Sequence, residues 1–233
     1  MTRFLITGSN RGIGLEFARQ LASRGDEVFA TCRQPDEASA LHGLAERYEG
    51  RVHVIQMEVT DDASIAAARK SVGKLTDTLD VVINNAGIYP DRTHRVQQTT
   101  REEMLRVFNT NSVSPLIVAQ HFTDLLTGAD VPRLVNITSR MGSISEKHSA
   151  SNYPYSTSKT ALNMITRMMA FELQRQGIAV VLISPGWVRT DMGGRSAPVA
   201  VEDSIRGMLK IIDQASVMSA GRYLQWDGQE LGW

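Results

Sequence analysis

The sequence has little cysteine, no excess of charge of either sign and no long hydrophobic run. Cys32 is the only cysteine among 233 residues, which excludes an internal disulfide and a cysteine metal cluster and fits a reducing compartment. We expect Cys32 to be buried as a small hydrophobic residue. The 25 Lys and Arg residues balance 25 Asp and Glu residues, so no net field attracts nucleic acid or an anionic membrane.

Other absences narrow the class of protein further. No apolar run approaches the roughly 18 residues that a membrane helix needs, and the first residues enter a predicted strand without a basic and then apolar leader. The five histidines show no metal-ligand spacing. We therefore expect a soluble, cytoplasmic protein that binds no nucleic acid, no membrane and no metal.

Short apolar runs rich in β-branched residues alternate with segments of helical period. This alternation is typical of parallel strands joined by helices. Several runs are apolar at consecutive positions, as in Val81-Val82-Ile83, so helices should cover both faces of the sheet. No linker or repeat interrupts the pattern, which predicts an α/β fold: one doubly wound (Rossmann) domain over 1–233 with about seven parallel strands. The expected strands are 3–7, 28–32, 52–59, 79–84, 133–138, 179–184 and 222–225.

Local signals mark several helix boundaries. Gly25 can end the first helix in the left-handed conformation, and Thr100 with Glu103 predicts a capping box at the start of a helix reaching about residue 126. A later helix runs to about Arg175 and carries Met164, Ile165, Met168 and Phe171 at helical spacing. We interpret these four as core packing in preference to a subunit interface.

A glycine-rich turn lies between the first predicted strand and the first predicted helix. In a dinucleotide fold such a turn needs glycines for a tight bend, for close approach to the pyrophosphate and for helix–strand packing, and the helix N-terminus faces the phosphates. Gly8, Gly12 and Gly14 are placed for these three tasks. The predicted cofactor contacts of the turn are Gly8, Ser9, Asn10, Arg11, Gly12, Ile13 and Gly14.

The end of the second strand indicates which nicotinamide cofactor is bound. A carboxylate about 20 residues after the turn normally holds the ribose 2′-hydroxyl of NAD, but here the position holds Arg33. Arg11 supplies a second guanidinium, and two guanidiniums suit a 2′-phosphate. This favours NADP(H) over NAD(H), with solvated surface arginines as the alternative.

Tyr155 and Lys159 are four residues apart and lie on one face of a predicted helix. A free phenol has a pKa near 10 and exchanges protons poorly at neutral pH. A fixed cation such as Lys159 favours the phenolate and should lower that pKa. Tyr155 can then protonate a carbonyl oxygen as hydride reaches the carbon; a surface pair on an amphipathic helix is the alternative.

These motifs together resemble the short-chain dehydrogenase/reductase family in its short single-domain branch. The resemblance covers nearly the whole chain and includes the C-factor and sniffer-like subgroup, to which the ending Trp226 to Trp233 is similar. It rests on Thr7-Gly8-x3-Gly12-x-Gly14, Asn84-Asn85-Ala86-Gly87, Asn111, Ser139, Tyr155-x3-Lys159 and Pro185-Gly186-x-Val188-x-Thr190.

The resemblance implies a role for each matching residue. Ser139 would hold the substrate carbonyl beside Tyr155, while Lys159 would also bind the nicotinamide ribose. Ser143 is a rival for the serine role, but Ser139 directly follows a strand, where ligands bind in open α/β sheets. The further cofactor contacts implied are Asn85, Ala86, Gly87, Pro185, Gly186, Val188 and Thr190, with Glu58 and Val59 near the adenine in place of the usual Asp.

Asn111 completes the catalytic set that the resemblance implies. In the family this asparagine helps to hold a water that connects to the lysine. Pro115 removes the amide that would bond the Asn111 carbonyl in a regular helix, which leaves that carbonyl free for the water as a hypothesis. Asn109 is the near decoy, expected on another face.

The expected function is that of an NADPH-dependent carbonyl reductase acting on a small aldehyde, ketone or alcohol. The alternative is a cofactor-binding signalling or regulatory protein of the C-factor type with weak or no turnover. The short segment between Thr190 and a helix near Val201, which contains Gly193-Gly194, predicts an open, mobile cleft. The family also makes a homodimer or homotetramer an expectation.

Overall fold

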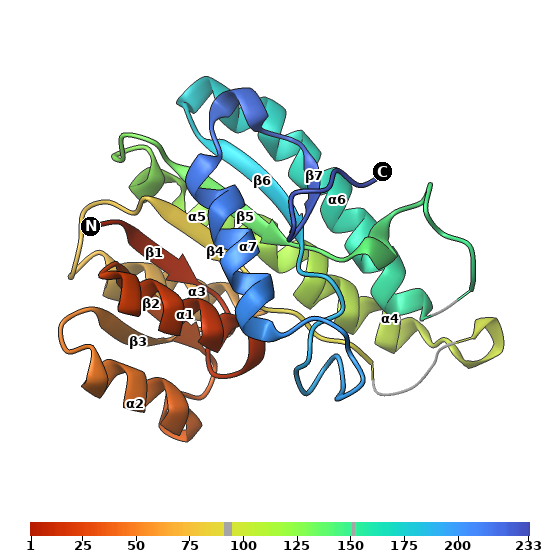
Figure 1. Cartoon of the computed structure of the whole chain (residues 1–233), viewed down its shortest axis with the longest axis horizontal. Coiled ribbons are helices and arrows are strands. Elements are labelled where there is room, and N and C mark those ends of the chain that lie inside the picture. The colour runs from red at the N-terminus through yellow and green to blue at the C-terminus, as the bar shows by residue number, and fades with distance from the viewer. Residues whose placement is uncertain (91–94, 151) are drawn as a thin grey trace.

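Seven parallel strands form one twisted sheet at the centre of the molecule (Figure 1). The computed structural model describes residues 1–90, 95–150 and 152–233. The strand order is β3-β2-β1-β4-β5-β6-β7, and the chain reverses its direction of travel across the sheet between β1 and β4. This is the doubly wound order of a Rossmann fold, as predicted. The strands are β1 Arg3–Ile6, β2 Glu27–Cys32, β3 Val52–Gln56, β4 Val81–Asn84, β5 Arg133–Ile137, β6 Ala179–Ser184 and β7 Tyr223–Gln225.

The third strand is shorter than the apolar pattern indicates. We expected it to run over 52–59, but β3 ends at Gln56. Met57 still donates its amide to the Cys32 carbonyl at the end of β2. Met57 and Val59 are buried beneath the next helix instead, so their hydrophobicity reports packing outside the sheet.

Two layers of helices cover the sheet (Figure 1). One hydrophobic cluster joins α1 and α7 to one face, through Phe17 and Met208 among others. A second cluster joins α3, α5 and α6 to the opposite face, through Phe122 and Met169 among others. The helices are α1 Gly12–Arg24, α2 Ser39–Arg47, α3 Asp62–Val72, α4 Arg101–Phe108, α5 Ser114–Leu126, α6 Tyr153–Leu173 and α7 Val201–Gln214.

The predicted helix boundaries agree closely with the structure, with one difference. Gly25 ends α1 with φ 93°, and the Thr100 hydroxyl accepts the Glu103 amide at 3.2 Å. The helix expected from about residue 101 to 126 is divided by a π-helical turn over Asn109–Val113. The proline predicted to disturb this helix, Pro115, follows that turn by two residues.

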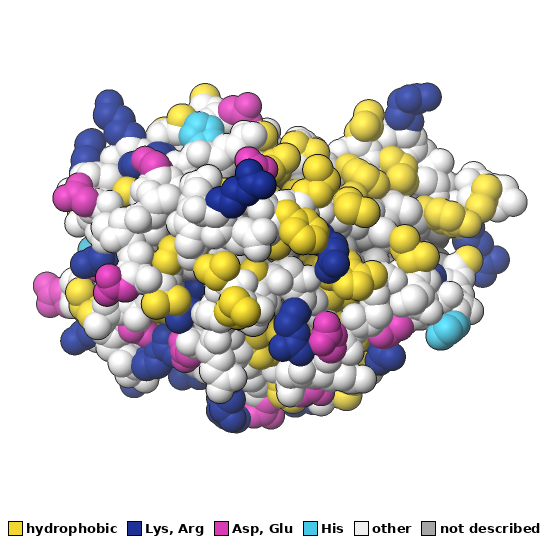
Figure 2. Space-filling view, turned by 90° about the horizontal axis from the view of Figure 1, so that it is seen from above, with side chains coloured by type: hydrophobic (Ala, Val, Ile, Leu, Met, Phe, Trp, Pro, Cys, Tyr) yellow, Lys and Arg dark blue, Asp and Glu magenta, His cyan; other side chains and the backbone are white. Residues whose placement is uncertain are grey.

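The exposed face of α6 corrects one prediction. Cys32 is buried as expected, and Ile165 packs partly against the core. However, Met164, Met168 and Phe171 are 62%, 62% and 61% exposed, so our preference for core packing was wrong for these three. Figure 2 shows hydrophobic side chains gathered on the half of the molecule that carries α4, α6 and the C-terminus in Figure 1. Of the helices in the described ranges, none is long and apolar enough to span a membrane.

Candidate active site

The glycine turn after β1 leaves room for a phosphate group at the N-terminus of α1. Gly8 and Gly12 adopt φ of 69° and 55°, which side chains other than glycine rarely tolerate. A Cβ on Gly14 would overlap the Gly8 carbonyl and lie 2.6 Å from Asn85 Nδ2. Arg11 opens α1 without a side-chain cap, so the first-turn amides remain available to an anion. This cradle fits a dinucleotide pyrophosphate.

Thr7 joins the turn after β1 to the turn after β4, a role that sequence analysis did not assign to it. Its hydroxyl accepts the amides of Asn85 and Ala86 at 3.0 and 2.9 Å. In return, Asn85 Nδ2 donates to the carbonyls of Thr7 and Gly8 at 2.9 and 3.0 Å. Buried Ser9 turns its hydroxyl inward to the Ile6 carbonyl, which makes it part of the frame of the turn, whereas Asn10 is exposed.

The two predicted phosphate-binding arginines are both exposed. Arg11 lies 3.5 Å from Asp191, and their side chains are 71% and 81% exposed. An ion pair this exposed is weak, so an anion can compete for the Arg11 guanidinium. Arg33 accepts Gln56 Nε2 at its carbonyl oxygen, and its side chain is open to solvent at the end of β2.

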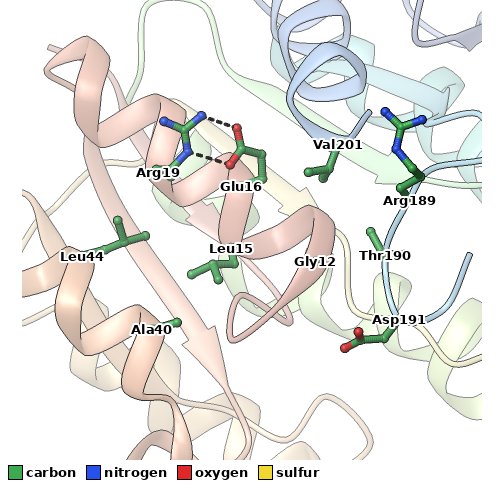
Figure 3. Close-up of a pocket in the computed structure, with 10 residues that line it drawn as sticks. All are labelled: Gly12, Leu15, Glu16, Arg19, Ala40, Leu44, Arg189, Thr190, Asp191 and Val201. Carbon is green, nitrogen blue, oxygen red and sulfur yellow. Dashed lines mark hydrogen bonds and ion pairs between the residues drawn. The ribbon is translucent and has the colours of Figure 1, made fainter. Parts of the chain in front are cut away.

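A cavity of about 340 Å³ borders the phosphate turn (Figure 3). Leu15, Ala40 and Leu44 line its apolar side between α1 and α2, while Thr190 and Val201 face them from the segment that leads into α7. Gly12 and Thr190 are the only predicted cofactor contacts in its lining. The predicted catalytic side chains Ser139, Tyr155 and Lys159 are not in its lining, so the cavity adjoins the glycine turn and not these three residues.

Tyr155, Ser139 and Lys159 meet where β5 ends against the first turns of α6. The Ser139 side chain lies close enough to the Tyr155 phenol to lower its pKa. Ser139 follows β5, and its Oγ accepts the Met141 amide at 3.2 Å. Lys159 is 5% exposed; its Nζ donates to the Ile137 carbonyl at 2.9 Å and lies 5.8 Å from the Tyr155 ring centre.

The pKa of Tyr155 moves in the direction opposite to the one that we predicted. Burial raises it to about 12, with the Ser139 side chain acting to lower it and Tyr89 to raise it. The Tyr89 ring packs on Tyr155 with 4.7 Å between ring centres, and sequence analysis did not single out Tyr89. Burial lowers the pKa of Lys159 to about 8. The cost of desolvating the Tyr155 phenolate thus outweighs its attraction to the Lys159 ammonium, which points to the Ile137 carbonyl.

Asn111 lies in the π-helical turn and is fully buried. Its side chain accepts the Ile88 amide at 2.8 Å and donates to the Ile88 carbonyl at 3.0 Å. It also donates to Ser158 Oγ at 3.1 Å, which ties it to α6. A Cβ on Gly87 would lie 3.3 Å from Asn111 Oδ1 and 3.7 Å from Lys159 Nζ, so these three residues converge. The freed Asn111 carbonyl stays a prediction.

The two competing residues have other tasks in the structure. Ser143 is buried, and its hydroxyl accepts the Glu146 amide and pairs with Ser145. Asn109 is exposed and accepts the Ser114 amide at its carbonyl oxygen. Both rivals are thus bonded within their own segments, and the preference for Ser139 and Asn111 stays a prediction.

The remaining predicted contacts lie at the carboxyl ends of β3 and β6. Glu58 accepts the Thr60 amide and hydroxyl, and Val59 is buried beside it. Thr190 faces Gly12, where a Cβ would lie 3.6 Å from Thr190 Cγ2. Pro185 and Val188 are buried, and Gly186 adopts φ 81°.

The segment between Thr190 and α7 is short, as expected, and hydrogen bonds hold it in place. The Arg189 amide donates to the Val199 carbonyl at 2.9 Å, and the Val199 amide donates to the Trp187 carbonyl at 3.2 Å. Trp187 Nε1 donates to the Gly193 carbonyl at 2.7 Å. These bonds brace the segment, and the open, mobile cleft stays a prediction.

Comparison with known proteins identifies the family. A family model for short chain dehydrogenase matches residues 2–198. The C-signal protein of Myxococcus xanthus is 38% identical over 158 residues, covering 68% of this chain and 95% of the relative. An NADPH-bound carbonyl reductase from chicken fatty liver has a TM-score of 0.93 at 36% identity, covering 100% of this chain and 98% of that one. The carbonyl reductase Sniffer of D. melanogaster has a TM-score of 0.95 at 32% identity, covering 100% of both chains. As its motifs predicted, the chain belongs to the short-chain dehydrogenase family of oxidoreductases.

Proposed function

We propose that this chain is an NADPH-dependent carbonyl reductase that transfers hydride to an aldehyde or ketone, with one NAD(P)-binding domain spanning 1–233. The observation that supports it is the convergence of Tyr155, Ser139 and Lys159 at the carboxyl edge of the sheet. Ligands of open α/β sheets bind at this edge. The glycine cradle at α1 faces the same edge.

The chain's residues divide the proton chemistry among them. When bound, the nicotinamide cofactor supplies the hydride that adds to the carbonyl carbon. Tyr155 Oη donates the proton that the carbonyl oxygen takes up, which completes the alcohol. Ser139 hydrogen-bonds the same oxygen and orients it, and the Lys159 ammonium stabilises the tyrosinate that remains. Asn111 holds α6 against the Ile88 backbone and so fixes the position of Lys159.

Cofactor preference follows from the charge at the end of β2. Arg33 and Arg11 offer guanidiniums to a 2′-phosphate, and the chicken relative was solved with NADPH bound. We expect Arg33→Asp to reverse the ratio of kcat/KM for NADPH and NADH, because the carboxylate repels the phosphate and accepts the ribose hydroxyl of NADH. Arg195→Asp, another arginine outside helices and strands, is the control. An unchanged ratio in Arg33→Asp would contradict the assignment.

The reaction itself is tested by following NADPH absorbance with a panel of aldehydes, ketones and quinones. We expect turnover that collapses in Tyr155→Phe, which removes the proton donor but keeps the ring against Tyr89. The matched control is Tyr153→Phe, because Tyr153 begins the same helix and is 36% exposed. Turnover that survives in Tyr155→Phe would overturn the assigned role.

The alternative is a signalling protein that binds the cofactor with weak or no turnover. Similarity to the protein named C-signal is the observation that favours it. The complete set of Tyr155, Lys159 and Ser139 argues for catalysis, since a sensor does not need all three. NADPH binding by fluorescence without reduction of any compound on the panel would support the alternative.

We also infer that the chain forms a homodimer or homotetramer. The exposed apolar face of α6, made of Met164, Met168 and Phe171, is the surface that a second copy would cover, since apolar patches on globular proteins commonly mark interaction sites.

A further inference from the structure

The turn that carries Ser139 is anchored by side chains from three other elements. This turn, Ser139 to Gly142, follows β5 and closes with a bond from the Gly142 amide to the Ser139 carbonyl at 2.8 Å. Ser184 at the end of β6 accepts the Arg140 amide at 3.1 Å. Thr160 of α6 donates to the Gly142 carbonyl at 2.9 Å. The turn is thus positioned by its surroundings as well as by its own sequence.

Tyr223 supplies the anchor from the edge of the sheet. It begins β7, is fully buried, and its hydroxyl donates to the Ser139 carbonyl at 2.6 Å. Tyr223 pairs with Leu182 of β6, and Leu182 pairs with Asn136 of β5, so the phenol crosses β6 to reach the end of β5. Neighbouring strands are about 4.8 Å apart, and only a long side chain can cover two such spacings.

Asn163 meets the turn from the opposite side. It is 3% exposed and lies one helical turn beyond Lys159 on α6. Its Nδ2 donates to the Gly142 carbonyl at 3.2 Å, and its Oδ1 accepts the Thr138 hydroxyl at 2.6 Å. Tyr223 and Asn163, both buried, therefore hold opposite ends of the turn.

The turn packs closely against α6 at Gly142. A Cβ on Gly142 would lie 2.8 Å from the Lys159 carbonyl carbon and 2.9 Å from Lys159 Cβ. The Ser184, Thr160 and Asn163 bonds hold Arg140 and Gly142, whereas the Tyr223 bond holds the Ser139 carbonyl itself. A displacement on the scale of 1 Å at a reacting group can lower a rate about a hundredfold.

We propose that Tyr223 is a positioning residue for the reductase reaction, and that with Asn163 it holds the Ser139 turn so that the Ser139 hydroxyl meets Tyr155. The inference rests on the proposed function. Tyr223 acts through Ser139, so its effect on the rate requires the serine hydroxyl.

The test is a double-mutant cycle with Tyr223→Phe and Ser139→Ala. Tyr223→Phe removes only the hydroxyl and keeps the buried ring. We expect kcat to fall about tenfold or more with the NADPH dissociation constant unchanged within about twofold, and no further fall when Tyr223→Phe is added to Ser139→Ala. Tyr48→Phe, at the end of α2 and partly buried, is the matched control and should retain full activity.

Two results would overturn the proposal: a kcat in Tyr223→Phe equal to that of the original chain, or losses that multiply in the double variant. The second would show that Tyr223 stabilises the fold without acting through Ser139. If Tyr223→Phe does not fold, Asn163→Ala takes its place in the same cycle, with the same expected and contradicting results.

Hydrogen exchange separates this inference from the proposed function. The Met141 and Gly142 amides are bonded to Ser139, and we expect them to exchange faster in Tyr223→Phe, whether or not a substrate is reduced. Faster exchange in a protein that reduces nothing would sustain the anchoring and contradict the reductase. If exchange is unchanged in Tyr223→Phe while the original chain reduces a substrate, the anchoring alone is contradicted and the proposed function stands.

Discussion

Lys159 is buried, and burial disfavours the charged form of its ammonium group. Burial lowers its pKa from 10.5 to about 8, while burial raises that of Tyr155 from 10.0 to about 12. At neutral pH the site therefore contains an ammonium and a protonated phenol. This is the protonation state that the proposed reduction needs, because in that proposal Tyr155 gives up a proton and the cation stabilises the tyrosinate that remains. In the free protein, Lys159 loses its proton first as pH rises.

The pH dependence should separate activity from stability. We expect kcat/KM for NADPH, which reports the free enzyme, to fall above about pH 8 as Lys159 becomes neutral.

Between about pH 8 and 10.5 the unfolded chain binds more protons at Lys159 than the folded chain does, so the contribution of this lysine to the free energy of unfolding rises with pH. Lys159→Met should abolish that rise, measured by urea unfolding across this range. Lys70→Met, an exposed lysine of α3, should leave it in place, and a rise that survives in Lys159→Met would contradict the lowered pKa.

Asn111 and Asn109 give a matched test of one buried amide. Asn111→Ala would leave the Ile88 amide and carbonyl without their side-chain partner. We expect a loss of about 1–3 kcal/mol in the free energy of unfolding, the cost of unpaired backbone groups, together with reduced turnover. Exposed Asn109→Ala should stay within about 0.5 kcal/mol of the original. Equal losses in the two variants, measured by urea unfolding, would show that the Asn111 contacts do not matter.

At the level of elements, the close approach of the β1–α1 turn to the turn after β4 sets the shape of the cradle. Gly14 has no space for a Cβ, which would overlap the Gly8 carbonyl and press on Asn85. Gly43 in α2 has nothing within 4 Å of such a Cβ. Packing therefore requires a glycine at position 14 but leaves room for a larger residue at position 43.

Substituting alanine at both positions should move stability in opposite directions. Gly14→Ala should lower the melting temperature and weaken NADPH binding at least about tenfold, because the turn must open to admit the methyl group. Gly43→Ala should raise the free energy of unfolding by up to about 1 kcal/mol, since alanine favours the helix. Calorimetry and NADPH fluorescence titration measure both, and tight binding by Gly14→Ala would contradict the packing described.

The sequence predicted elements well where a local pattern determines them. Gly25 and Thr100 mark helix ends because the backbone conformation or the cap bond needs only neighbouring residues. The end of β3 at Gln56 was missed, because Met57 and Val59 are as apolar as strand residues but pack under a helix. The π-helical turn at Asn109–Val113 was also missed, since hydrophobic period does not distinguish it from an α-helix.

At the scale of the whole molecule, the strand order decides what sequence analysis can find. The glycine turn was predicted because it follows a strand, the Tyr155–Lys159 pair because of its spacing on one helix, and Asn85 through the family resemblance. Tyr223 was not, because its contact with Ser139 exists only once β6 separates β7 from β5. The Tyr155 pKa was predicted in the wrong direction for a similar reason: spacing along a helix shows a nearby cation but not the burial that outweighs it.

The exposed face of α6 leads to the last prediction, which concerns assembly. Met164, Met168 and Phe171 recur at intervals of four and three residues and so share one helix face, where Arg167 lies 5.5 Å from the centre of the Phe171 ring. A second copy would remove this face from water, and burying a carboxylate at its centre would cost more free energy than burying the methionine side chain. We expect Met168→Glu to be monomeric in sedimentation experiments in which the original chain is a dimer or tetramer. Met218→Glu, at a 95% exposed methionine outside α6, should assemble normally. An original chain that remains monomeric at tens of micromolar would contradict the assembly, whereas an oligomer that tolerates Met168→Glu would place the interface on another face.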